Sequence, residues 1–192
     1  IVAIAGFALP TLSASDWSKQ AAALAPSLGS LRWSFEPDRV VCTVFTINAD
    51  KGYAATDNHC LPEAWGYPEG IVVDGHEASV VWRDAALDLA VVKTVYFNRP
   101  NVQLRTKPLK VGMEIASFGY GHGAKKYVSK FGNVSQLNPI FIWTDPEPWV
   151  DMLVFSYYLV PGMSGGPTID RDGKLVAMNQ YNTAEFGGLG MG

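Results

Sequence analysis

From Leu28 onward, the chain consists of short stretches in which apolar and polar residues alternate, separated by clusters of turn-forming residues. A period of two is typical of strands that bury one face. Turn signals such as Asp74-Gly75 lie between the stretches. In the first half, the pattern predicts strands at Leu31–Phe35, Val40–Asn48, Tyr53–Thr56, Gly70–Val73, Ala78–Arg83 and Leu89–Val95. This number of short strands within one half indicates a small β-barrel.

The same pattern resumes after a connection at residues 98–110. It predicts strands at Glu114–Phe118, Lys126–Leu137, Ile140–Thr144, Met152–Phe155, Thr168–Ile169 and Leu175–Gln180. We therefore expect an all-β fold with two antiparallel barrels of six strands each. Residues 27–110 would form the first barrel and residues 111–192 the second.

The first 26 residues have a different pattern. Ile1 to Leu9 is an apolar run, which we interpret as a buried strand or an interface segment. The end of a secretory signal is the alternative, because small residues follow the run. Asp16 is expected to cap a short alanine-rich helix at Trp17–Ala25, and Pro26 to end it.

Composition narrows the class of protein. The chain has 192 residues, of which 48% are hydrophobic and 17% charged, so it can bury a sizeable core and is not disordered. A net charge of -3 gives no electrostatic reason to expect a nucleic acid or an anionic membrane surface as partner. No apolar run reaches the roughly 18 to 20 residues of a membrane-spanning helix.

The stretch PGMSGGP, Pro161 to Pro167, contains the first candidate for chemistry. Glycines two positions before and after Ser164 let the backbone bend sharply and let a substrate carbonyl approach the main chain. Such a turn suits a nucleophilic serine beside an oxyanion hole, with the N–H groups of Gly162 and Ser164 as donors. An ordinary Pro-Gly loop is the alternative.

A nucleophilic serine needs a base, and a base needs an orienting acid. His59 follows a predicted strand of the first half, whereas His76 follows a turn and His122 lies in a glycine-rich loop. Asp88 is a carboxylate within the apolar run ALDLAVVK, and burying a carboxylate costs several kcal/mol unless a partner compensates it. Asp84 fits better as a residue that caps a turn.

The contexts of these residues resemble those of chymotrypsin-fold serine proteases: His59 in TDNHC, Asp88 in LDLAVVK and Ser164 in PGMSGGP. Their order and their spacings of 29 and 76 residues resemble the HtrA branch of that fold. LKVGMEIASFGYG, the following FGNVSQL and GKLVAMNQ are similar to further HtrA segments. The resemblance implies an active site in the cleft between two barrels.

The resemblance also implies a reaction. Ser164 would attack a peptide carbonyl to give an acyl-enzyme, His59 would move the proton, and Asp88 would orient the imidazole; Asp84 and Asp57 are the alternative acids. The expected partner is a polypeptide substrate, and in that family the domain forms a homo-oligomer, a trimer. We expect no cofactor and no metal.

Tyr158 lies six residues before Ser164, at the position where trypsin has its specificity aspartate. A pocket for Lys or Arg is therefore disfavoured, since a buried cation would lack its counter-charge. A pocket for a small or medium apolar side chain is expected instead. Its predicted lining is Tyr158, Leu159, Val160, Asn179 and Gln180.

Cys42 and Cys60 are the two cysteines of the chain. Secreted chymotrypsin-fold proteases have a disulfide at the matching place, which implies the same bond here and a secreted, periplasmic or virion-associated location. Two reduced cysteines in a cytosolic protein are the alternative.

Other functions stay open at this point. A viral or secreted polyprotein-processing protease, including the glutamyl type, would have the same motifs, and so would a catalytically silent binding module of the same fold. HtrA-like domains continue past the segment that resembles GGLGMG, so the second barrel is expected to be incomplete at Gly192.

Overall fold

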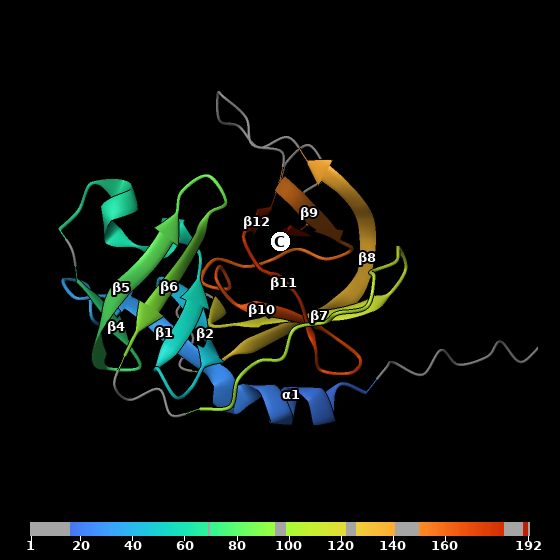
Figure 1. The fold of residues 1–192 in the computed structure, drawn as a ribbon, viewed down its shortest axis with the longest axis horizontal. Helices are drawn as coiled ribbons and strands as arrows, with labels where there is room; N and C mark the ends of the chain where they lie inside the picture. The colour runs from blue at the N-terminus through green and yellow to red at the C-terminus, as the bar shows by residue number, and fades with distance from the viewer. Residues whose placement is uncertain are drawn as a thin grey trace, which may run out of the picture.

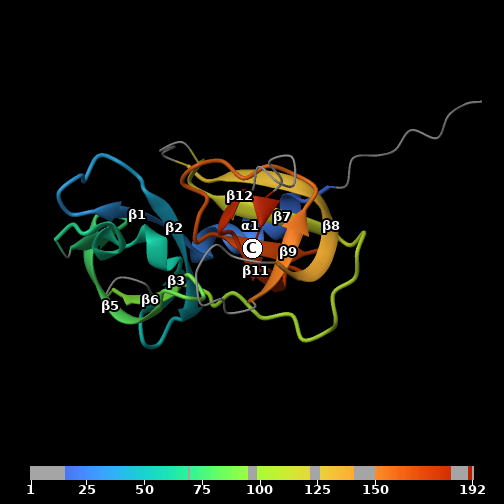
Figure 2. The same cartoon turned by 90° about the horizontal axis from the view of Figure 1, so that it is seen from above.

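The structure is a computed structural model that describes residues 16–68, 70–94, 99–121, 126–140, 150–182 and 190–191. It consists of two β units that lie side by side, with one short helix packed below the second unit (Figures 1 and 2). This arrangement confirms the expected all-β fold class. The apolar run at Ile1 to Leu9 lies outside the described residues.

The first unit is a closed barrel with the strand order β1-β2-β3-β6-β5-β4, in which all neighbours are antiparallel. Its strands are β1 (Leu28–Trp33), β2 (Cys42–Asn48), β3 (Tyr53–Thr56), β4 (Ile71–Val73), β5 (His76–Asp84) and β6 (Leu89–Lys93). The 3-10 helices η2 (Asn58–Cys60) and η3 (Pro62–Trp65) follow β3. Asp74 and Gly75 both have positive φ between β4 and β5, as a type I′ hairpin requires.

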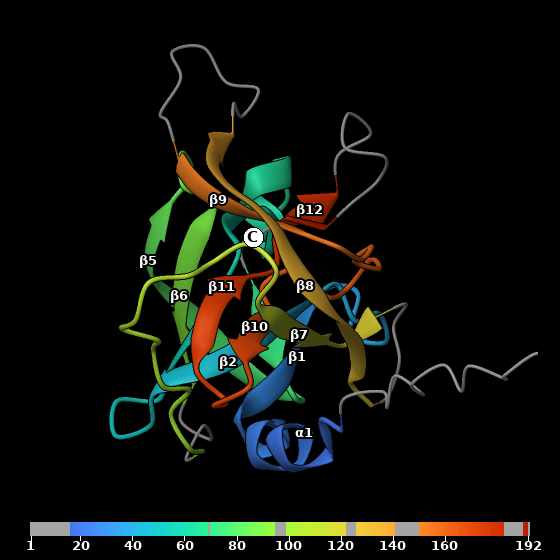
Figure 3. The same cartoon turned by 90° about the vertical axis from the view of Figure 1, so that its right-hand side faces the viewer.

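The second unit is a curled sheet of seven strands in the order β11-β10-β7-β8-β9-β13-β12 (Figure 3). Its strands are β7 (Glu114–Gly119), β8 (Val128–Ile140), β9 (Val150–Phe155), β10 (Pro167–Asp170), β11 (Leu175–Met178), β12 (Tyr181–Asn182) and β13 (Gly190–Met191). The sheet differs from the expected six-stranded barrel in strand number. Most of the strand expected at Ile140–Thr144 lies outside the described residues.

Helix α1 (Ser18–Leu24) is followed by the 3-10 turn η1 (Ala25–Ser27), which contains Pro26. The expected N-cap at Asp16 is wrong by one residue, because Trp17 occupies the cap position and makes no side-chain cap bond. The Asp16 carboxylate still accepts a hydrogen bond from the Ser18 N–H at 2.8 Å. Among the described residues, no helix is long and apolar enough to span a membrane.

One hydrophobic cluster joins the helix to both β units. Its buried members come from α1 and its N-cap residue, from β1 and β2 of the first barrel, and from β7 and β10 of the second sheet: Trp17, Leu24, Leu28, Phe45, Ala116, Phe118 and Ile169. Separate clusters fill the first barrel and the second sheet. The shared cluster buries apolar surface from each part and so fixes the two units relative to one another.

The expected disulfide is present. It joins Cys42, the first residue of β2, to Cys60, the last residue of η2, over a sequence separation of 18. Both cysteines are buried in the core of the first barrel. The bond therefore ties the segment after β3 to the start of β2.

Reduction of this bond is expected to lower the free energy of unfolding by about 3 kcal/mol, the value of the chain-entropy model for a loop of this size. Urea unfolding of the protein with and without a reductant measures the difference. The Cys42→Ala, Cys60→Ala double variant is the control, because the reductant should leave its unfolding midpoint unchanged. Equal stability of the oxidised and reduced wild-type protein would contradict the expectation.

Candidate active site

His59 and Asp88 contact each other beside the paired strands β3 and β6 of the first barrel. His59 lies in η2, directly after β3, and Asp88 lies directly before β6, which pairs with β3. The distance between His59 Nδ1 and Asp88 Oδ2 is 2.6 Å. The backbone N–H of His59 donates to Asp88 Oδ1 at 2.8 Å, and that of Asn58 donates to the Asp88 carbonyl at 3.1 Å. The carboxylate therefore holds both the ring and the backbone of the histidine.

Asp88 adopts a backbone conformation that is uncommon for a non-glycine residue, with φ at 52°. The turn before it is held by Asp84, whose Oδ1 accepts the N–H groups of Ala86 and Leu87 at 2.9 and 3.1 Å. Asp84 thus serves as a turn cap, as its sequence context suggests. The turn directs the carboxylate of Asp88 to His59, and this contact holds the strained residue in place.

The turn before Ser164 has the features of a type II turn over Val160 to Met163. Pro161 is its second residue, Gly162 its third with φ at 93°, and the Met163 N–H donates to the Val160 carbonyl at 3.0 Å. A Cβ at Gly162 would stand 2.4 Å from the Tyr120 carbonyl oxygen. Within the described part of the chain, the N–H groups of Gly162 and Ser164 donate to no protein acceptor.

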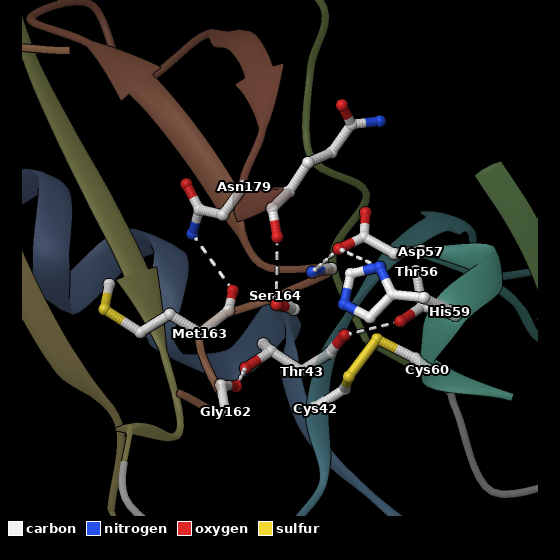
Figure 4. Close-up of a disulfide and its surroundings, with 12 residues drawn as sticks. Cys42, Thr43, Thr56, Asp57, His59, Cys60, Gly162, Met163, Ser164 and Asn179 are labelled. Carbon is white, nitrogen blue, oxygen red and sulfur yellow. Dashed lines mark hydrogen bonds and ion pairs between the residues drawn. A yellow bond between two sulfur atoms is a disulfide. The ribbon is translucent and has the colours of Figure 1, made fainter. Parts of the chain in front are cut away.

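Thr43 connects this turn to the first barrel (Figure 4). Its N–H donates to the Ser164 carbonyl and its hydroxyl to the Gly162 carbonyl, both at 2.8 Å. The same hydroxyl oxygen accepts the Tyr120 N–H at 2.9 Å. Thr43 is fully buried and follows Cys42 of the disulfide. Sequence reasoning missed this residue, and its position beside the cysteine was the one signal that could have pointed to it.

Gly165, the residue after Ser164, lies against the first barrel. Its N–H donates to the Asn179 carbonyl at 2.8 Å and to Asp57 Oδ2 at 2.7 Å. A Cβ at this position would stand 2.3 Å from Thr56 Oγ1 and 2.4 Å from the Thr43 carbonyl oxygen. Because φ is also positive, at 75°, the position requires glycine.

The hydroxyl of Ser164 donates to the carbonyl oxygen of Gln180 at 3.1 Å. Figure 4 shows the imidazole of His59 on the side of Ser164 that faces the first barrel. Hydrogen bonds between catalytic groups often tighten when substrate binds. The structure thus brings His59 and Asp88 into contact and holds Ser164 nearby through Thr43 and Gly165.

Asp57 is a second carboxyl group near His59. It is fully buried, and its Oδ2 lies 3.8 Å from His59 Nδ1. Its Oδ1 is buried without a hydrogen-bond partner among the described residues. Burial raises the pKa of Asp57 well above its ordinary value, the negative charge of Asp88 raises it further, and the hydrogen bond from Gly165 opposes both effects.

The residues expected to line the substrate pocket have different environments. Tyr158 is 54% exposed, Val160 is half-buried, and Leu159 is buried. Asn179 is buried, and its amide donates to the Phe118 and Met163 carbonyls while its Oδ1 accepts from Thr168. The Gln180 side chain donates to the Leu87 carbonyl at 3.0 Å.

His76 and His122 are the other two histidines of the chain. His76 is the exposed first residue of β5, and His122 lies outside the described residues. Among the described residues, Asp57, His59 and Asp88 also have ligand atoms within 4.8 Å of one another, a spacing that could hold a metal. The Nδ1 atom of His59 is, however, already bonded to Asp88, and the cysteines are joined in the disulfide. The arrangement is therefore that of an oriented base.

Comparison with known proteins supplies the family. The profile of the family described as "Trypsin-like peptidase domain" matches residues 42–178. The "Probable periplasmic serine endoprotease DegP-like" of Halomonas elongata is 30% identical over 159 residues, which cover 80% of this chain. The chain spans a third or less of the curated relatives it matches, 32% of the Halomonas protein and 18% of the "Pro-apoptotic serine protease NMA111" of Phaeosphaeria nodorum.

Solved structures support the fold. The active form of the Rv3671c protease from M. tuberculosis has a TM-score of 0.77 at 23% identity, over 90% of this chain and 77% of that one. The HtrA-type protease AlgW with a tripeptide has a TM-score of 0.74 at 23% identity, over 92% of this chain and 59% of that one. These similarities agree with the chymotrypsin-like fold.

Asp57 is expected to make stability depend on pH. In the unfolded chain its carboxyl ionises near 3.8, whereas burial keeps it protonated to higher pH in the folded protein. The protonated carboxyl group of Asp57 therefore contributes fully to the free energy of unfolding below pH 3.8. This contribution is lost as the pH rises through the raised pKa, by up to about 1.4 kcal/mol per pH unit. Asp57→Asn cannot ionise, so its free energy of unfolding should fall less over that range.

Urea unfolding at a series of pH values from about 4 upward measures this slope. Substitution of an exposed carboxylate, Asp50→Asn, is the matched control and should leave the slope as in the wild-type protein. Parallel curves for the wild-type protein and Asp57→Asn would contradict the expectation.

Proposed function

The chain belongs to the trypsin-like peptidase domain family, and from this premise we propose that it is a serine endopeptidase of the HtrA type, with His59, Asp88 and Ser164 as catalytic residues. The observation that carries the proposal is the 2.6 Å contact between His59 Nδ1 and Asp88 Oδ2, next to a glycine-rich turn that contains a serine. An imidazole oriented by a carboxylate is what a neutral serine hydroxyl requires to become a nucleophile.

The reaction proceeds in two halves. Ser164 Oγ attacks the carbonyl carbon of the scissile peptide while its proton moves to His59 Nε2. The imidazolium then protonates the leaving amine, and the C–N bond breaks to give an acyl-enzyme. Water repeats the sequence and releases the acid. Asp88 keeps the proton of the resting imidazole on Nδ1 and stabilises the imidazolium, a role supported by its bonds to both the ring and the backbone of His59.

The backbone N–H groups of Gly162 and Ser164 form the oxyanion hole in this proposal. It is supported by the type II turn and by the bonds of Thr43 to the carbonyls of Gly162 and Ser164, which restrain the peptide groups that follow these two residues. Donors fixed before the reaction need no reorganisation when charge develops on the substrate oxygen. The loss of one such donor typically lowers turnover by about 10² to 10³-fold.

Ser164 must turn before it reacts. Its hydroxyl donates to the Gln180 carbonyl, and the proposal requires the hydroxyl to turn so that it donates to His59. The 3.1 Å distance is longer than that of most O–H···O hydrogen bonds, so the loss of this bond costs no more than about 1 kcal/mol net. The rotation is therefore a small part of the barrier to peptide hydrolysis.

The substrate is a polypeptide in this proposal, and the pocket beside Ser164 accepts a small or medium apolar side chain. Val160 is half-buried and supplies apolar surface, and it packs against the buried cluster that contains Leu159. The amide of Asn179 is already engaged by the Phe118 and Met163 carbonyls. Tyr158 and Gln180 complete the proposed lining. A Lys or Arg side chain would find no carboxylate among these five residues, which disfavours it.

A periplasmic or secreted location is supported by two observations. The cysteines form a disulfide, which persists in oxidising compartments. Two bacterial relatives, from Halomonas elongata and Pseudomonas putida, are named as periplasmic. Neither observation points to a virion. Assembly into a homo-oligomer is part of the proposal through the HtrA resemblance alone.

Covalent labelling tests the nucleophile. A fluorophosphonate should add one phosphonyl group to the wild-type protein and none to Ser164→Ala, because the reagent reacts with an activated serine hydroxyl. Intact-mass analysis measures the adduct, and circular dichroism checks that the variant is folded. An unlabelled but folded wild-type protein would favour the silent binding module, and an adduct on Ser164→Ala would assign the nucleophile to another residue.

Substitution of Asp88 tests the orienting acid. Asp88→Asn should reduce kcat by about 10⁴-fold with KM little changed, because the amide presents its N–H to Nδ1 and favours the wrong tautomer of His59. Hydrolysis of a fluorogenic peptide measures both constants, and Asp84→Asn is the comparison from the same turn. Full activity in Asp88→Asn would transfer the role to Asp57.

A further inference from the structure

We propose that Asp57 is a positioning residue of this site, whose carboxyl group ties the loop that carries His59 to the turn that carries Ser164. The inference rests on the proposed protease function and adds to it a residue outside the three catalytic ones. Asp57 precedes His59 by two residues in the sequence, and its hydrogen-bond donor, Gly165, directly follows Ser164.

The contact between the two segments is a direct hydrogen bond from Gly165 to Asp57. Asp57 Oδ2 accepts the Gly165 N–H at 2.7 Å and lies 3.8 Å from His59 Nδ1 (Figure 4). One oxygen atom therefore faces both the base and the backbone next to the nucleophile. A displacement of this carboxyl group would change the distance between His59 and Ser164, on which proton transfer depends.

The tie complements the contact made by Thr43. Thr43 binds the carbonyl groups of Gly162 and Ser164, whereas Asp57 binds the N–H of Gly165. The backbone of the turn is thus held before and after the serine, by residues of two different segments of the first barrel. Of Thr43 and Asp57, only Asp57 also belongs to the segment that carries His59.

The surroundings of Asp57 favour the uncharged carboxylic acid. It is fully buried, and a carboxylate oxygen of Asp88 lies within 4.8 Å of its own carboxyl group. His59 is the basic group that faces it among the described residues, and the imidazole is already bonded to Asp88. An ionised Asp57 would place a second, fully buried negative charge beside one imidazole.

The two oxygens of Asp57 fit this assignment. Oδ2 accepts a hydrogen bond and so acts as the carbonyl oxygen, whereas Oδ1 has no partner among the described residues and can carry the proton. An unpartnered hydroxyl is less costly to bury than an unpartnered charge. Asp88 then remains the single negative charge next to His59, and Asp57 supplies an acceptor without competing for the imidazolium.

Kinetics of three variants test the tie. Asp57→Ala removes the acceptor, so kcat should fall at least tenfold while KM changes little. Asp57→Asn keeps an acceptor of the same shape without a charge, so it should recover most of the loss. The pH at which the acidic limb of kcat/KM is half-maximal should agree between Asp57→Asn and the wild-type protein. Asp50→Ala, in an exposed turn, is the matched control.

Three results would overturn the inference. Wild-type kcat in Asp57→Ala would show that the tie does not position the site. The absence of recovery in Asp57→Asn would show that a charged carboxylate is required. A shift of the acidic limb to lower pH by about one unit in Asp57→Asn would show that an anion had been removed 3.8 Å from the imidazole.

A measurement that needs no turnover separates this inference from the proposed function. In Ser164→Ala protein labelled with ¹³C at aspartate carboxyl groups, the resonance of Asp57 is identified by its absence from the Asp57→Asn, Ser164→Ala variant. Its chemical shift should still be that of a protonated acid at about pH 5, where exposed aspartates are already ionised. Ionisation near pH 4 would overturn the inference, whether or not fluorophosphonate labels the wild-type protein.

Discussion

The close approach of Gly165 to the first barrel is the constraint on which the site depends. At this residue the turn of Ser164 touches Thr43, Thr56 and Asp57 at distances that exclude even a methyl group. The contact lets hydrogen bonds cross from one β unit to the other, so that the turn of Ser164 is positioned by the same barrel that holds His59. The shared hydrophobic cluster fixes the two units relative to one another, and this contact sets the place of the turn within that arrangement.

The two aspartates near this contact, Asp88 and Asp57, have different surroundings. Asp88 is partly exposed and is stabilised by three hydrogen bonds from the His59 segment. Asp57, buried a few ångströms away, has one hydrogen bond and no countercharge of its own. Burial therefore favours the protonated form of Asp57, although its one hydrogen bond, from Gly165, opposes this effect.

Local sequence signals predicted the features that depend on neighbouring residues. Asp74-Gly75 specifies its hairpin, Pro161-Gly162 its turn, and the apolar context of Asp88 indicated a carboxylate with a partner. The roles of Thr43 and Asp57 could not be predicted in this way, because they arise from contacts with residues more than 100 positions away. The strands β12 and β13 were not predicted, because two residues are too few to show an alternating pattern.

The chain order of the site residues has a consequence for the time at which the site forms. His59, Asp88 and Thr43 lie in the first barrel, whereas Ser164 follows 76 residues after Asp88, in a turn that also depends on contact with that barrel. In the proposed mechanism, the amino-terminal half therefore leaves the ribosome with the base and without the nucleophile. The complete arrangement can exist only after the second sheet has been made and has docked. Under the proposed function, a chain that is still being made cannot cleave itself or its neighbours.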